Sequence, residues 1–168
     1  MAVVDSAEAG LRAATRATII QLRAPGATAR EVEREAAQLV ASSPVPVLVS
    51  SRCDIALAVG AAGVNLPEGD ISPAEARSLI GGGLVGRSVH SIEAARRAAQ
   101  EGADFLIFGP VFSSPTHPRG APAGLAALAE VVRAVSIPVV AIGGMTEARI
   151  SEVSAAGAAG YAAIRLFA

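Results

Sequence analysis

Two adjacent glycines, Gly143 and Gly144, stand at a position where the backbone could bind a phosphate group. They follow the apolar run 138–142, which predicts a buried strand, and they precede Thr146, where a helix is expected to begin. Glycine lets the backbone approach a ligand closely, and the N–H groups at a helix start attract anions. On these residues alone, a tight turn without a ligand remains the alternative.

The rest of the chain predicts elements that would place other polar side chains beside these glycines. Short apolar runs alternate with amphipathic stretches, which is typical of a parallel sheet covered by helices. We expect strands at 3–4, 18–22, 45–49, 63–66, 84–88, 105–108, 138–142 and 161–164. We expect helices at 6–16, 28–40, 54–59, from Ser72 onward, 91–102, 125–134 and 146–156. This order predicts a compact α/β fold, a (β/α)8 TIM barrel with its last helix missing; a doubly wound open sheet is the alternative.

The composition restricts the class of protein. A length of 168 residues, 52% of them hydrophobic, predicts a single domain over 1–168. Because the net charge is −1, we expect neither nucleic acid nor an anionic membrane as a partner. The chain shows neither a signal peptide nor a membrane-spanning run, so we expect a cytoplasmic protein. Without the last helix, one face of the barrel would be uncovered, and this face could bind a second copy of the chain to form a homo-oligomer.

In a (β/α)8 barrel, catalytic and binding groups lie on the loops that follow the strands. At these positions the sequence has mostly cationic and hydroxyl side chains, a mixture that suits a phosphorylated small molecule. The candidates are Gln21, Arg23, Ser50, Ser51, Arg52, Asn65, Glu68, Asp70, Ser88, His90, Ser113, Ser114, Thr116, His117, Arg119, Gly143, Gly144 and Arg165.

Three segments together resemble the thiamine phosphate synthase superfamily. They are Val-Gly-Arg-Ser-Val-His-Ser at 85–91, Gly-Ala-Asp-Phe-Leu-Ile-Phe-Gly-Pro-Val-Phe at 102–112 and Ser-Ile-Pro-Val-Val-Ala-Ile-Gly-Gly-Met-Thr at 136–146. The first segment and Asn-Leu-Pro-Glu-Gly at 65–69 are more similar to the TenI branch, the thiazole tautomerases. The resemblance implies a barrel that binds thiazole phosphate. Such a barrel either joins the thiazole to a pyrimidine or shifts its double bond to give the aromatic tautomer.

The match to the synthase pattern is incomplete. The resemblance assigns substrate or phosphate binding to Gln21, Arg23, Ser88, Ser114 and Thr116, and Mg²⁺ binding to Asp70. Pro25 and His117 replace two lysines of the pattern, and Ser50-Ser51 replaces its Asn-Asp pair. Pyrophosphate departure depends on charge neutralisation, so these differences favour the tautomerase over the synthase.

The tautomerase pattern has its own difference, because Pro110 stands where that pattern has a proton-transferring histidine. Histidine is the side chain best suited to accept and return a proton near neutral pH. His117, in the same loop, and His90, at a helix start, are the catalytic candidates. Gly143 and Gly144, assisted by Arg165, would hold the phosphate, and tautomerisation would need no cofactor.

Three functions follow, in order of preference. The first is a TenI-like barrel that binds thiazole phosphate or a related heterocycle and tautomerises it. The second is a thiamine phosphate synthase that uses Mg²⁺ and hydroxymethylpyrimidine pyrophosphate. The third is a catalytically silent, ligand-binding or regulatory barrel, which the substitutions Pro25, Ser51, Pro110 and His117 suggest.

Overall fold

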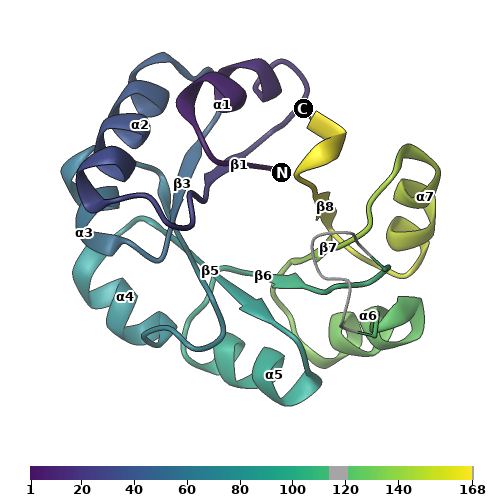
Figure 1. The fold of residues 1–168 in the computed structure, drawn as a ribbon. Helices are drawn as coiled ribbons and strands as arrows, with labels where there is room; N and C mark the ends of the chain where they lie inside the picture. Colours follow the sequence, from purple (N-terminus) through teal and green to yellow (C-terminus); the bar gives the residue numbers. More distant parts are fainter. Residues whose placement is uncertain (114–120, 168) are drawn as a thin grey trace.

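A computed structural model describes residues 1–113 and 121–167 of the chain. Eight parallel strands form one sheet in the order β1 to β8, and helices surround it (Figure 1). The strands are β1 Ala2–Val4, β2 Ile20–Leu22, β3 Val47–Ser50, β4 Gly63–Leu66, β5 Leu84–Val89, β6 Phe105–Phe108, β7 Val139–Ile142 and β8 Gly160–Ala162. The helices are α1 Ala7–Ala13, α2 Ala29–Ser42, α3 Cys53–Ala58, α4 Pro73–Ile80, α5 Ile92–Gln100, α6 Gly124–Ala134 and α7 Glu147–Ala155.

The last strand meets the first, so the sheet is a barrel and not an open doubly wound sheet. Ala2 and Ala163 form a parallel bridge, and the Val3 N–H donates to the Ala163 carbonyl at 2.9 Å. A short 3-10 helix, η1 (Arg165–Phe167), follows β8 within the described residues, and it lies between α7 and α1 in Figure 1. The Phe167 ring stacks on Tyr161 with the ring centroids 6.0 Å apart. The expected (β/α)8 barrel is thereby confirmed, with seven α-helices among residues 1–113 and 121–167.

Alternation along each strand separates a barrel interior from an outer face that the helices cover. Leu48, Phe105 and Ile107 form the buried part of an interior cluster, against which Val140 and Ile142 pack. The Phe105 ring fits here because Gly86 has no side chain. A Cβ at Gly86 would lie 2.1 Å from the ring. This apolar cluster packs inside the barrel, and the polar residues Ser50, Asn65 and Ser88 lie near the carboxyl ends of their strands. None of the helices described in the two ranges is long and apolar enough to cross a membrane.

The ends of several elements differ from the sequence-based prediction. The second strand begins at Ile20 and not at residue 18, because β1 offers it only three partners, Ala2 to Val4. The first helix ends at Ala13, three residues before the expected end. The eighth strand ends at Ala162, and the chain then turns into η1.

The start of α4 gives a stability prediction. The Ser72 hydroxyl accepts the Glu75 N–H at 3.2 Å, and the Glu75 carboxylate accepts the Ser72 N–H at 2.7 Å. Ser72→Ala removes one half of this capping box, so we expect a loss of about 1 kcal/mol in the free energy of unfolding. Urea denaturation measures the change, and Ser78→Ala, an exposed position within α4, is the matched control. Equal stabilities of the two variants would contradict the assignment.

Candidate active site

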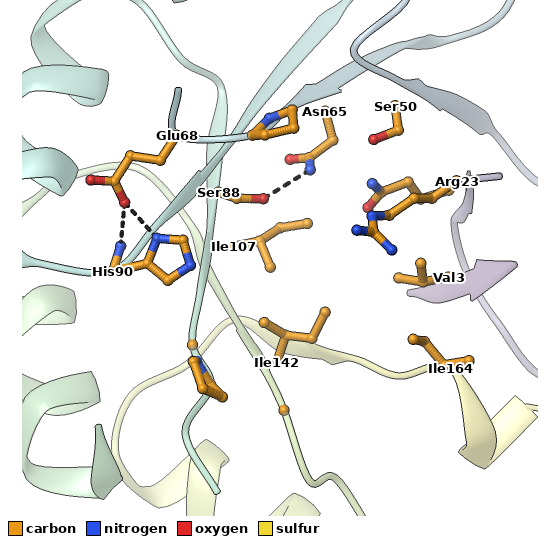
Figure 2. A pocket seen from close by; sticks show the side chains of 15 residues that line it. Val3, Arg23, Ser50, Asn65, Glu68, Ser88, His90, Ile107, Ile142 and Ile164 are labelled. Atoms are coloured by element: carbon orange, nitrogen blue, oxygen red, sulfur yellow. Dashed lines mark hydrogen bonds and ion pairs between the residues drawn. The ribbon is translucent and has the colours of Figure 1, made fainter. Parts of the chain in front are cut away.

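A cavity of about 250 Å³ opens at the carboxyl ends of the strands (Figure 2). The residues that line it come from all the strands of the barrel or from the loops that follow them. They are Val3, Gln21, Arg23, Ser50, Asn65, Pro67, Glu68, Ser88, His90, Ile107, Gly109, Pro110, Ile142, Gly143 and Ile164. The lining combines apolar side chains with a few polar ones, as in most sites for small molecules.

Strand register brings the polar lining residues together. Ser50 on β3 pairs with Asn65 on β4, and Ser88 lies two residues beyond the β5 partner of Asn65. Gln21 and Asn65 are only 3% and 2% exposed, although both are polar. Polar side chains at this depth are costly unless they are hydrogen-bonded, so their presence in the cavity points to binding.

The side-chain amide of Asn65 is only partly hydrogen-bonded. Its Nδ2 donates to the Ser88 hydroxyl at 3.1 Å. Its Oδ1 is buried and has no hydrogen-bond partner among the described residues. Leaving a buried carbonyl oxygen without a hydrogen-bond donor destabilises the fold. A ligand with an N–H or O–H group would remove this cost.

Glu68 and His90 form a pair on the rim of the cavity. The Glu68 Oε2 lies 2.6 Å from His90 Nδ1 and also accepts the His90 backbone N–H at 2.9 Å. Both contacts are drawn in Figure 2, where the opposite edge of the imidazole ring faces the cavity. From the sequence alone, Glu68 is a candidate only as one of the loop residues that follow the strands. Its partner is 22 residues away in the chain and is brought near by the pairing of β4 with β5.

The buried Arg87 holds the loop that carries Glu68. Its guanidinium donates to the carbonyl of Ile71 at 2.6 Å, of Glu68 at 2.6 Å and of Asp70 at 3.2 Å. Arg87 neighbours Ser88 on β5, so its side chain points away from the barrel interior into which Ser88 points. It therefore shapes the rim without lining the cavity.

The loop after β7 has the backbone conformation that the two glycines allow. Gly143 has φ +100° and Gly144 has φ +62°, both in the region that favours glycine. A Cβ on Gly143 would lie 2.6 Å from the Pro110 Cα, and one on Gly144 would lie 2.4 Å from the Ser113 carbonyl oxygen. Thr146, the N-cap of α7, makes no side-chain hydrogen bond to the helix start. The first-turn N–H groups, which have no partner within the helix, are thus not capped by that side chain.

A second arginine holds this glycine loop against the loop after β6. Arg149 on α7 donates to the Gly144 carbonyl at 2.6 Å, and its guanidinium lies 4.4 Å from the centroid of the Phe112 ring. These contacts fix the position of the Gly143 backbone at the cavity wall.

Asp70 lies on the side of the barrel where β3 and β4 end. Its Oδ1 accepts the Ile71 N–H at 2.8 Å.

Burial raises the pKa of the Cys53 thiol, and the nearby Asp70 and Asp54 carboxylates raise it further. Cys53 is therefore a buried thiol and not an activated nucleophile. Among residues 1–113 and 121–167, no three His, Cys, Asp or Glu side chains come together as a metal site.

The loop after β3 gives a pH prediction. Hydrogen bonds from Arg52, at 2.8 and 2.5 Å, lower the pKa of Asp54 from 3.8 to about 2. A lowered pKa contributes stability above the ordinary value, and that contribution is lost as the pH falls through the folded value. We expect Asp54→Asn to flatten the dependence of unfolding free energy on pH between these two values, as measured by denaturation at each pH. An unchanged slope would contradict the pair's contribution.

The structure brings together five of the predicted site residues: Gln21, Arg23, Ser88, His90 and Gly143 all line the cavity. Gly144 follows in the same loop. Arg165 is exposed in η1, one residue after Ile164, which lines the cavity. The predicted residues Ser114, Thr116 and His117 lie outside the described residues.

Comparisons with known proteins cover nearly the whole chain. The family model described as thiamine monophosphate synthase matches residues 2–167. A thiamine-phosphate synthase of Chloroflexus aurantiacus is 41% identical over 97% of this chain and 75% of its own length. One from Methanoculleus marisnigri is 42% identical over 93% of this chain and 76% of its own length. The solved structure of a thiamine phosphate pyrophosphorylase from Pyrococcus furiosus matches with a TM-score of 0.88 and 33% identity, over 97% of this chain and 83% of that one. The chain therefore belongs to the thiamine monophosphate synthase family.

Proposed function

We propose that this barrel joins a thiazole phosphate to hydroxymethylpyrimidine pyrophosphate and releases pyrophosphate. In this reaction the thiazole nitrogen bonds to the pyrimidine methylene carbon, and the carbon–oxygen bond to pyrophosphate breaks with its electron pair leaving on oxygen. The observation that carries the proposal is that Gln21, Arg23, Ser88 and Gly143 line one cavity. All four match positions of the synthase pattern. The relatives compared above are named as synthases, which also supports this reaction over the tautomerisation that the TenI-like segments favour.

The proposed roles follow from the chemistry of each group. The Gly143 and Gly144 loop and the start of α7 would hold the thiazole phosphate through backbone N–H groups. Arg23, whose guanidinium reaches into the cavity in Figure 2, would contact the pyrophosphate. Asn65 Oδ1 would accept a hydrogen bond from a ligand N–H group.

Asp70 would supply one carboxylate ligand to a magnesium ion that arrives with the pyrophosphate, and it would do so from outside the set of residues that line the cavity. Magnesium is commonly held by one or two carboxylates, with substrate phosphates and water completing its shell. The hydroxyls of Ser50 and Ser51 lie at the neighbouring strand exit, and oxygen donors suit this ion. When bound, the ion would neutralise charge on the departing pyrophosphate.

Arg23→Ala tests the synthase proposal. A charge-assisted hydrogen bond contributes about 1.5–3 kcal/mol, so we expect pyrophosphate release to slow by about 10- to 100-fold. The measurement is a coupled assay of pyrophosphate with both substrates and Mg²⁺ present.

The control is Arg97→Ala, because Arg97 is exposed in the last turn of α5, at the opposite end of the barrel. We expect that variant to release pyrophosphate at the wild-type rate. An Arg23→Ala rate equal to that of the control would remove Arg23 from the site.

A second function, tautomerisation of a thiazole carboxylate phosphate, is favoured by the position of His90. Its ring lines the same cavity, held by Glu68, although Pro110 occupies the place of the histidine in the TenI pattern. An NMR time course of the non-aromatic tautomer with the purified protein tests this function. No acceleration over buffer would exclude it. Ligand binding without turnover of either kind would leave the silent, ligand-binding barrel.

A further inference from the structure

We propose that Glu68 and Arg87 are positioning residues that hold His90 with its Nε2 directed into the cavity as a proton-transfer group. The proposal deepens the second function above and rests on it for the reaction that His90 serves. The orientation of the ring can be measured without any substrate, so it can be tested separately.

The contacts of Glu68 determine which nitrogen of His90 carries the proton. An ionised carboxylate only accepts hydrogen bonds, so the 2.6 Å contact with Glu68 Oε2 requires a proton on His90 Nδ1. In a neutral ring this leaves a lone pair on Nε2. The same oxygen accepts the His90 backbone N–H, which fixes the main chain together with the ring.

The ring orientation places Nε2 where a ligand would lie. In Figure 2 the side of the His90 ring away from Glu68 faces the open part of the cavity. Ser88 and Asn65 line the same cavity and are joined by a hydrogen bond. The lone pair is therefore directed toward the same space as the polar groups that would bind a ligand.

Arg87 fixes the loop from which Glu68 reaches His90. The Arg87 side chain binds three carbonyls of residues 68–71 and is 9% exposed, so the loop has one preferred position. A buried guanidinium is stable only when its donors are paired, which couples Arg87 and this loop tightly. Arg87 does not line the cavity, and its hydrogen bonds go to the loop that carries Glu68, so it acts through Glu68.

The chemistry needs only one proton carrier. A ring C–H bond of the substrate breaks as Nε2 accepts the proton, and the electron pair shifts through the conjugated ring. The imidazolium, paired with Glu68, then returns a proton to the exocyclic carbon, where a new C–H bond forms. No oxidant or reductant takes part. The Glu68 carboxylate orients the ring and stabilises the imidazolium, as the aspartate of a catalytic triad does.

The test is ¹⁵N NMR of the histidine rings in the full chain. The sequence has two histidines, so His117→Ala identifies the His90 signals directly. We expect His90 as the Nδ1–H tautomer in the wild type, conversion toward Nε2–H in Glu68→Ala, and retention of Nδ1–H in Glu68→Gln, whose amide oxygen still accepts. Arg87→Lys, which cannot bind all three carbonyls, is expected to give a mixture. Glu93→Gln, an exposed position in the first turn of α5, is the control.

The activity measurement is kinetic. We expect kcat for tautomerisation to fall about 100-fold in His90→Ala and about tenfold in Glu68→Ala, with KM unchanged in the latter. A wild-type His90 in the Nε2–H form, or a His90 tautomer that is the same in Glu68→Ala as in the wild type, would overturn the positioning role. An unchanged kcat in Glu68→Ala would overturn it as well. If the wild-type protein converts no substrate while the NMR result is as expected, the orientation is supported and the second function fails.

Discussion

Gly143→Ala is expected to weaken the binding of thiazole phosphate by about 10- to 100-fold. The backbone there has φ +100°, and a Cβ would lie 2.6 Å from both the Cα and the Cβ of Pro110. Forcing a side chain into such a position costs about 1–3 kcal/mol, which the loop avoids by moving its N–H groups away from the phosphate. Isothermal titration calorimetry with thiazole phosphate measures the change.

The control for this prediction is Gly102→Ala. Gly102 follows α5, has φ +86°, and has nothing within 4 Å of an added Cβ. It thus carries the backbone cost without the clash and lies at the opposite end of the barrel. We expect its affinity to equal that of the wild type. If Gly143→Ala also binds with wild-type affinity, the phosphate does not depend on this loop.

Gly63→Ala is expected to have the largest effect on stability. A Cβ at this position would lie 2.0 Å from the Leu84 carbonyl oxygen and 2.6 Å from its nitrogen. The contact is with backbone, so the pairing of β4 with β5 must open to accommodate a methyl group. We expect a loss of about 3 kcal/mol or more in the free energy of unfolding, at the upper end for overpacking.

Guanidinium chloride denaturation measures this loss, and Gly69→Ala is the control because nothing lies within 4 Å of a Cβ there. The control is expected to keep wild-type stability. A Gly63→Ala variant as stable as the control would show that β4 and β5 are not packed as closely as described.

The barrel could be predicted from the sequence because its elements are defined locally. Apolar runs of the strands, and N-cap residues such as Ser72, depend on neighbours within a few positions. The ends of the strands could not be predicted as well, because they depend on partners. The second strand, for example, begins at Ile20 where the three-residue strand β1 begins to pair with it.

The candidate site was predictable where a residue type stands at a strand exit, and not where two exits must meet. Arg23 and His90 follow from their positions in the chain. The pairing of Glu68 with His90 does not, since it depends on the register of β4 with β5 and on Arg87, which holds the loop from the outer side of the strand. Glu68 looks like a solvated acid in the sequence because its partner lies 22 residues away.

Short motifs alone do not predict which of the two reactions this chain catalyses. The segment at 86–91 is more similar to the TenI branch, yet the relatives that match nearly the whole chain are named as synthases. Similarity over the full length samples every strand exit, whereas the two TenI-like motifs, at 65–69 and 86–91, sample only the exits of β4 and β5. The synthase is therefore our first proposal, although Pro25 and Ser51 differ from its pattern.

The most direct test of that proposal is to detect thiamine phosphate by liquid chromatography. The purified protein is incubated with saturating thiazole phosphate, hydroxymethylpyrimidine pyrophosphate and Mg²⁺, and product is compared with a protein-free control. We predict thiamine phosphate and pyrophosphate in equal amounts, at a rate that falls in Arg23→Ala. No product from a folded protein that binds both substrates would contradict the synthase and leave the tautomerase or the silent barrel.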